Sequence, residues 1–156
     1  MPVPPPAADH RTPTRTVSVA IIGAGPRGVG VLERLAANLD ELWTDHTDAG
    51  GCRIAVHLVD PYPAGPGRIW RFEQSPLLKL NSMAADVTMF TDESSVIDGP
   101  VSPGPSLIEW AREVRSGRIT LERSRVDERL RLEIEHLLPE SFPTRRLQSL
   151  YLTWFY

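Results

Sequence analysis

Three glycines, Gly23, Gly25 and Gly28, stand between an apolar run and an amphipathic pattern, and their spacing suits a phosphate-binding turn. The first glycine permits a tight turn out of a strand, the second lets a pyrophosphate approach the backbone, and the third lets a helix pack close to the strand. The N-terminus of that helix would add unpaired N–H groups and partial positive charge. The pattern therefore predicts a dinucleotide site whose phosphates contact these glycines and the start of the helix.

An acidic residue, Asp60, supplies the second half of this pattern. It ends the apolar stretch 53–59, where a carboxylate can accept hydrogen bonds from ribose hydroxyls. Asp60 lies further from Gly28 than the roughly 20 residues expected, and the polar stretch 44–51 accounts for the excess as a longer loop. The alternative is that Asp60 only begins a turn with Pro61. An acid at this position argues against a 2′-phosphate, and so against NADP at this site.

These residues need a strand, a helix and a second strand to position them. The stretch 17–22 is short, apolar and rich in β-branched residues, as is typical of a strand buried on both faces. Pro26 suits the first turn of a helix, and apolar residues recur after it at helical spacing. A second strand is expected at 53–59, and a third is possible at 87–90. The predicted fold class is α/β: a Rossmann-like βαβ unit with additional helices and an incomplete parallel sheet.

The rest of the chain is expected to be helical. The patterns predict one helix over 105–116, ended by Gly117 as its C-cap, and a second over 122–138 with one apolar face. The proline-rich stretch 99–106 is expected to be a loop. The stretch 142–156 is strongly apolar at its end. Within it, Arg145 and Arg146 are expected to be a surface pair at the start of a helix, although they could also meet a phosphate.

Composition limits the class of protein. The chain has 156 residues, of which 41% are hydrophobic and 24% charged, so its length suits one domain and its composition allows a packed core. Residues 16–156 are expected to form the N-terminal part of a Rossmann-like domain. The net charge of −3 gives no reason to expect a nucleic-acid partner. The single cysteine, Cys52, allows no internal disulfide, the histidines are scattered, and we predict no metal site.

The N-terminal stretch and the absence of long apolar runs suggest where the protein acts. Residues 1–15 are rich in proline and lack the apolar stretch of a signal peptide, so we expect a disordered tail. No apolar run approaches the roughly 20 residues that span a membrane. The sequence therefore predicts a cytoplasmic protein with no membrane partner.

Several further motifs carry a family resemblance. In order along the chain they are GAGPRGVGVLERL, HLVDPYPAGPGRIW, QSPLLKLN, VTMFTD, GPSLIEWAR and FPTRRLQSLYLTWFY. Together they resemble the bacterial FAD/NAD(P)-binding proteins of the flavin-monooxygenase-like superfamily. The resemblance covers nearly all of the chain from Val17 onward, and several motifs in the same order are more specific than the glycines alone.

The resemblance implies that FAD binds at the glycine motif and that a later domain, not present in this chain, binds NAD(P)H. Asp60 would bind the adenosine ribose, and the pyrophosphate turn would be formed by Gly23, Gly25, Pro26, Arg27 and Gly28. The loop through Gly67, Arg68 and Trp70 would pass along the cofactor. Gln74 would lie near the flavin ring, and Asn81 would have a buried polar role beside it.

Lys79 is a candidate substrate-binding residue. Its spacing from Gln74 resembles that in the N-hydroxylating monooxygenases of ornithine and lysine, where such a lysine helps to hold the amino-acid substrate. The alternative is that Lys79 is a solvated charge.

Two functions remain open from the sequence. The first is the N-terminal FAD-binding portion of a flavin-dependent oxidoreductase, expected to be an NAD(P)H-dependent monooxygenase. The second is a non-catalytic truncated chain, or a nucleotide-binding subunit that needs a partner chain or a second copy of itself. The sequence has no second glycine motif, which favours the second function for this chain alone. No side chain is predicted to be a catalytic acid, base or nucleophile, and we expect the chain alone to be inactive.

Overall fold

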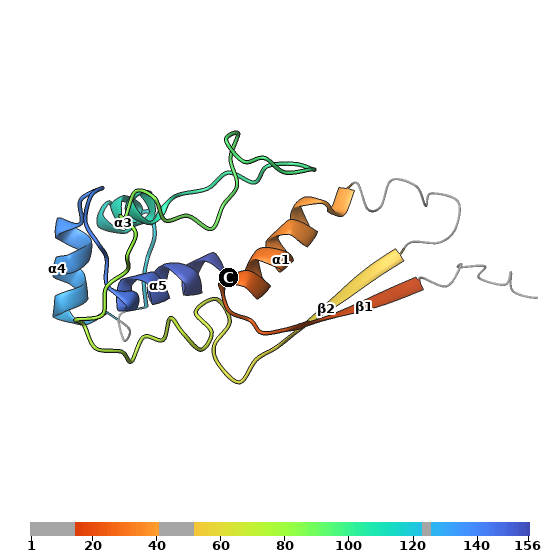
Figure 1. Cartoon of the computed structure of the whole chain (residues 1–156), viewed down its shortest axis with the longest axis horizontal. Coiled ribbons are helices and arrows are strands. Elements are labelled where there is room, and N and C mark those ends of the chain that lie inside the picture. The colour runs from red at the N-terminus through yellow and green to blue at the C-terminus, as the bar shows by residue number, and fades with distance from the viewer. Residues whose placement is uncertain (1–14, 41–51, 123–125) are drawn as a thin grey trace, which may run out of the picture.

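The computed structural model describes residues 15–40, 52–122 and 126–156 (Figure 1). The predicted disordered tail lies outside the described residues except for Arg15, which begins the first strand. The elements of the described residues form two groups: the strand pair with the helix between them in the chain, and a cluster of the later helices (Figure 1).

The first group is the predicted βαβ unit. Strand β1 (Arg15–Ile22) leads through the glycine turn into helix α1 (Pro26–Ala37), and strand β2 (Cys52–Val59) follows. The two strands pair in parallel, with Val17 opposite Ile54 and Ile22 opposite Val59. The predicted α/β class and incomplete parallel sheet are therefore confirmed. This sheet is open, since the side chains of Ile22 and Val59 are 78% and 53% exposed.

The second group contains the hydrophobic core. Helices α3 (Leu107–Arg115), α4 (Glu128–His136) and α5 (Arg145–Phe155) pack together, and α5 runs from this cluster toward the start of α1 (Figure 1). Each helix contributes fully buried side chains, among them Trp110, Leu130 and Tyr151. The rings of Trp110 and Tyr151 meet edge to face with centroids 5.7 Å apart. Burial of these large apolar surfaces stabilises this cluster.

The prediction of a possible third strand at 87–90 is wrong, because these residues form no strand. The carbonyl of Val87 accepts a hydrogen bond from the N–H of Leu107 at 2.8 Å, and the N–H of Met89 donates to the hydroxyl of Tyr151 at 3.2 Å. The backbone groups that a strand would use for pairing are therefore bonded to the start of α3 and to a core side chain.

The helix predicted over 122–138 is shorter than expected. Helix α4 begins only after Asp127, whose carboxylate accepts a hydrogen bond from the N–H of Leu130 at 3.0 Å. An N-cap of this kind fixes the start of a helix, and it overrides the apolar periodicity that continues before it. The predicted end of the helix over 105–116 is confirmed, because Gly117 follows the C-cap Ser116 with a φ of 77°. The stretch 99–106 contains no helix or strand, as expected.

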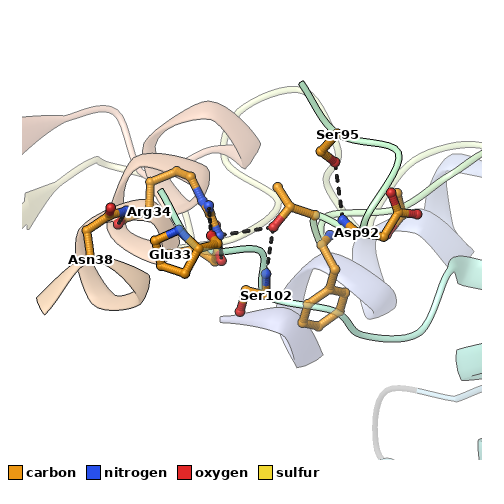
Figure 2. A network of polar contacts seen from close by, with 10 residues as sticks. Glu33, Arg34, Asn38, Asp92, Ser95 and Ser102 are labelled. Carbon is orange, nitrogen blue, oxygen red and sulfur yellow. Dashed lines mark hydrogen bonds and ion pairs between the residues drawn. The ribbon is translucent and has the colours of Figure 1, made fainter. Parts of the chain in front are cut away.

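Arg34 connects helix α1 to the segment that leads into α3 (Figure 2). Its guanidinium donates to the carbonyl of Pro100 at 2.8 Å and to the hydroxyl of Thr91 at 3.1 Å. Glu33 pairs with the same guanidinium, and this hydrogen bond holds the pKa of Glu33 below its usual range. The N–H of Ser102 also donates to the hydroxyl of Thr91. This one hydroxyl therefore accepts hydrogen bonds both from Arg34 of α1 and from the segment that leads into α3.

Candidate functional site

The glycine turn lies where β1 ends and α1 begins. The N–H of Gly23 donates to the carbonyl of Val59 at 2.8 Å, which fixes the turn to the end of the neighbouring strand. A Cβ at position 28 would come within 1.9 Å of the Gly23 carbonyl oxygen and 3.3 Å of the Ile21 side chain. The helix can therefore approach the strand this closely only with glycine at position 28, as the motif predicts.

The start of α1 has hydrogen-bond donors to offer. Gly25 is the N-cap and provides no side-chain cap, Pro26 follows it, and the first turn has no acidic residue. In the described part of the chain, the N–H groups of Gly25, Arg27 and Gly28 have no hydrogen-bond partner. A helix N-terminus with free N–H groups and no competing carboxylate is suited to hold an anion such as phosphate.

A cavity of about 570 Å³ opens beside this turn. The exposed guanidinium groups of Arg27 and Arg68 add positive charge to its largely apolar walls. Its size and its few polar groups are typical of a small-molecule site, and they fit the phosphate-bearing part of a dinucleotide. The cavity brings together seven of the residues predicted to bind the cofactor: Gly23, Gly25, Pro26, Arg27, Gly28, Arg68 and Trp70.

Asp60 has the turn-forming role considered as the alternative, and also a contact with the glycine turn that the sequence did not indicate. One carboxylate oxygen accepts a hydrogen bond from the N–H of Ala24 at 2.7 Å, and the other accepts from the N–H of Tyr62 at 2.8 Å. The side chain thus joins the glycine turn to the loop that follows β2. Each oxygen keeps a further lone pair, so contact with a ribose hydroxyl stays a prediction.

The loop after β2 forms the second wall of the cavity. The N–H of Gly65 donates to the carbonyl of Ala24 at 2.8 Å. At Gly67, φ is 58° and a Cβ would come within 2.7 Å of the Gly25 Cα. Two backbone segments therefore meet here without side chains between them, and this explains the glycine spacing that follows Asp60.

The same loop also touches helix α5. A Cβ at Gly65 would come within 2.2 Å of the carbonyl oxygen of Leu152. The loop is consequently held between the glycine turn on one side and the last turn of α5 on the other. This contact joins residues far apart in the sequence, and no local signal could have revealed it.

Gln74 lies close to the cavity wall. Its Nε2 donates to the carbonyl of Ile69, which lines the cavity, and its Oε1 is buried with no hydrogen-bond partner. A buried acceptor without a partner is costly unless another donor reaches it. Contact with the flavin ring stays a prediction for this residue.

Lys79 and Asn81 lie apart from the cavity at the glycine turn. Lys79 pairs by its backbone with Thr144, next to α4 and α5, and lines a separate cavity of about 390 Å³. Its role in substrate binding stays a prediction. Asn81 is exposed in this chain, and its role beside the flavin stays a prediction. Its neighbour Leu80 takes the buried position instead.

The expectation that Arg145 and Arg146 form a surface pair is wrong. Both side chains are partly buried at the start of α5 and lie over aromatic rings, so they do not form a solvated surface pair. Sequence spacing could not reveal this, because the rings belong to Trp70 and Phe72 in the loop after β2.

None of the helices in the described ranges combines the length and the apolar composition needed to cross a membrane. No group of three or more potential metal ligands occurs within the same ranges.

Comparison with known proteins adds independent findings. A family model described as FAD-NAD(P)-binding matches residues 20–156. The nitrosuccinic acid synthase npaA of Aspergillus oryzae is 40% identical over 147 residues, which are 93% of this chain and 19% of that protein. An L-aspartate N-monooxygenase (nitrosuccinate-forming) of Streptomyces davaonensis is 38% identical over 141 residues, which are 90% of this chain and 20% of that protein.

A third relative is similar to the same extent. It is an L-aspartate N-monooxygenase (nitrosuccinate-forming) of Streptomyces cremeus, 41% identical over 139 residues, which are 88% of this chain and 20% of that protein. The chain thus spans about a fifth of the length of the curated relatives it matches.

Proposed function

Since this chain belongs to the FAD-NAD(P)-binding family, we propose that it forms the N-terminal, FAD-binding portion of a flavin-dependent monooxygenase that uses NAD(P)H. The observation that carries this proposal is the cavity at the glycine turn, which has free helical N–H groups and two arginines beside it. The family match supports FAD and NAD(P)H as the cofactors.

We propose L-aspartate as the substrate and oxidation of its amino nitrogen as the reaction. Support comes from the three relatives, one named for nitrosuccinate synthesis and two for N-oxygenation of L-aspartate, which share 38–41% identity with the chain. Because the chain spans about a fifth of each relative, the described residues supply the dinucleotide turn and not the whole of such an enzyme.

The chain's own residues would bind and orient the cofactor. The free N–H groups of Gly25, Arg27 and Gly28 would donate to the phosphates, and the guanidinium groups of Arg27 and Arg68 would balance their charge. Asp60 would hold the turn in shape and accept a hydrogen bond from the ribose. When bound, the flavin supplies the hydride and oxygen chemistry, while the protein supplies binding and orientation.

The open sheet suggests a macromolecular partner. Because Ile22 and Val59 are exposed at the ends of both strands, we propose that further polypeptide covers them, either from the same protein or from a second chain. The expected cytoplasmic location stays a prediction.

Titration with FAD tests the assignment of the cavity. A Gly25→Val variant should lose FAD binding, because the new side chain would enter the path of the phosphates. The variant should still fold, because the nearest atom to a Cβ at this position is the Gly67 Cα at 3.9 Å. Gly30→Val is the matched control, since a Cβ there has no neighbour within 4 Å. Flavin fluorescence measures both affinities.

In the same titration, Asp60→Asn should weaken FAD binding by about 1–3 kcal/mol, because a charged acceptor is lost. Unchanged affinity in the Gly25→Val variant would refute the site. NAD(P)H oxidation that depends on L-aspartate, measured in the full-length enzyme, tests the proposed reaction separately.

A further inference from the structure

Two arginines at the start of α5 hold the loop that forms the second cavity wall. The guanidinium carbon of Arg145 lies 5.6 Å from the centroid of the Trp70 ring, and that of Arg146 lies 4.7 Å from the centroid of the Phe72 ring. A planar guanidinium over an aromatic face is attracted by the ring's charge distribution and also stacks on it. Two successive residues of α5 therefore contact alternate residues of one loop.

The two arginines differ in their other partners. Arg146 also pairs with Asp127 of the α4 cap, with N and O atoms 2.6 Å apart. Arg145 has no carboxylate partner among the described residues, and its Nε is buried without a hydrogen bond. The Trp70 ring is consequently the interaction partner that the structure gives the Arg145 guanidinium.

The two rings also differ in what they line. Trp70 forms part of the cavity at the glycine turn. Phe72 lines a different hollow, beside Ser149 and Thr153 on α5. The segment that carries both rings belongs to no helix or strand, and the N–H of Trp70 makes one long hydrogen bond of 3.3 Å, to the carbonyl of Pro66. Side-chain stacking must therefore help to fix the indole in place.

From these contacts we propose that Arg145 is a positioning residue of the cofactor site: its guanidinium lies over the Trp70 ring and fixes the indole as a wall of the cavity. The Arg146–Phe72 contact holds the same loop but does not act on the cavity. This inference rests on the proposed FAD site, and it assigns a function to a residue that does not itself line that site.

Four single variants of the chain test the inference: Arg145→Met, Arg145→Lys, Arg146→Met and Trp70→Ala. Arg145→Met should weaken FAD binding about five-fold, within the range that a cation–π contact contributes. Arg145→Lys keeps the charge but loses the planar stack, so it should recover part of that affinity. Arg146→Met should lower the melting temperature, because its ion pair is lost, and should leave FAD affinity within about two-fold.

The double variant Arg145→Met/Trp70→Ala isolates the contact. If Arg145 acts through the indole, the double variant should bind FAD no more weakly than Trp70→Ala alone. Additive losses would overturn the inference, and so would equal losses from Arg145→Met and Arg146→Met.

Amide hydrogen exchange separates this inference from the proposed function. The N–H of Trp70 should exchange faster in Arg145→Met than in Arg146→Met, whether or not FAD is present. If the unmodified chain failed to bind FAD, the proposed function would fail while the exchange experiment still tested the contact. Equal exchange at Trp70 in the two variants would overturn the role of Arg145.

Discussion

In the β1–α1–β2 region, Ala24 and Val29 are the buried apolar side chains among the described residues. In contrast, α3, α4 and α5 bury large side chains almost completely: Trp110, Leu130 and Tyr151. The glycine turn and its cavity belong to the first region, and the hydrophobic core belongs to the second. The proposed binding site and the hydrophobic core thus lie in different parts of one chain. The loop between β2 and α3 joins them, through backbone contact at Gly25 and at Leu152.

The largest expected effect comes from the helical core. Trp110→Ala should lower the free energy of unfolding by about 3–5 kcal/mol, because it removes a fully buried ring. Val31→Ala, at a side chain that is 50% exposed on α1, should change it by no more than about 0.5 kcal/mol. Urea denaturation measures both. Similar losses in the two variants would contradict the separation of stability from the binding region.

Trp110→Phe is the control for this experiment. It keeps an aromatic ring in the core and removes a buried N–H that has no hydrogen-bond partner. It should therefore cost much less than the change to alanine.

The next effect concerns two glycines that both have positive φ but lie in different regions. Gly67→Ala should lower the free energy of unfolding by about 2–4 kcal/mol, because a left-handed backbone with a Cβ is strained and the new atom meets the Gly25 backbone. FAD affinity should fall with it, since the turn and the cavity wall must separate.

Gly117→Ala is the matched substitution in the helical region. Its φ is 77° but a Cβ there meets no atom within 4 Å, so only the backbone strain of about 1–2 kcal/mol is expected. FAD affinity should stay as in the unmodified chain. Loss of FAD binding in Gly117→Ala would show that the helical end controls the cavity more directly than its contacts suggest.

The smallest effect is a dependence of stability on pH in the helical region. Hydrogen bonds from the Ser106 backbone and side chain lower the pKa of Glu109, and a hydrogen bond from the Leu130 backbone lowers that of Asp127. Both carboxylates cap helices. Because their folded-state pKa lies below the unfolded value near 4, their contribution is complete above about pH 5 and is lost as the pH falls through the folded pKa.

Melting temperatures between pH 7 and pH 3 measure this contribution, expected to be about 1 kcal/mol or less per cap. Glu109→Gln removes one titrating group while keeping the shape of the side chain. The melting temperature of this variant should therefore fall less steeply than that of the unmodified chain as the pH decreases. An identical pH profile in Glu109→Gln would contradict the assignment to this cap.

The strands, the turn and the start of α1 were predictable from the sequence because they depend on neighbours in the chain. The order of apolar residues, glycines and Pro26 is enough to indicate strand, turn and helix. The structure confirms β1, α1 and β2 close to their expected bounds.

Features that depend on distant residues could not be predicted. The stretch 87–90 has strand-like residues, but its backbone bonds to Leu107 and Tyr151, which lie in other elements. The contacts of Arg145 with Trp70 and of Asp60 with Ala24 also cross long separations in the chain. Only the folded arrangement reveals that these side chains connect parts of one site.

The contact between Gly65 and Leu152 has a consequence for the order of events during synthesis. The ribosome makes the glycine turn early, and β1, α1 and β2 can begin to pair once β2 has emerged. The second wall of the cavity has no support from α5 until Leu152 has left the exit tunnel, because it packs on the backbone there. Contacts between residues so far apart also form slowly, since the intervening chain loses more entropy when the ends meet. A nascent chain would therefore carry the glycine turn for some time before it has a finished cavity.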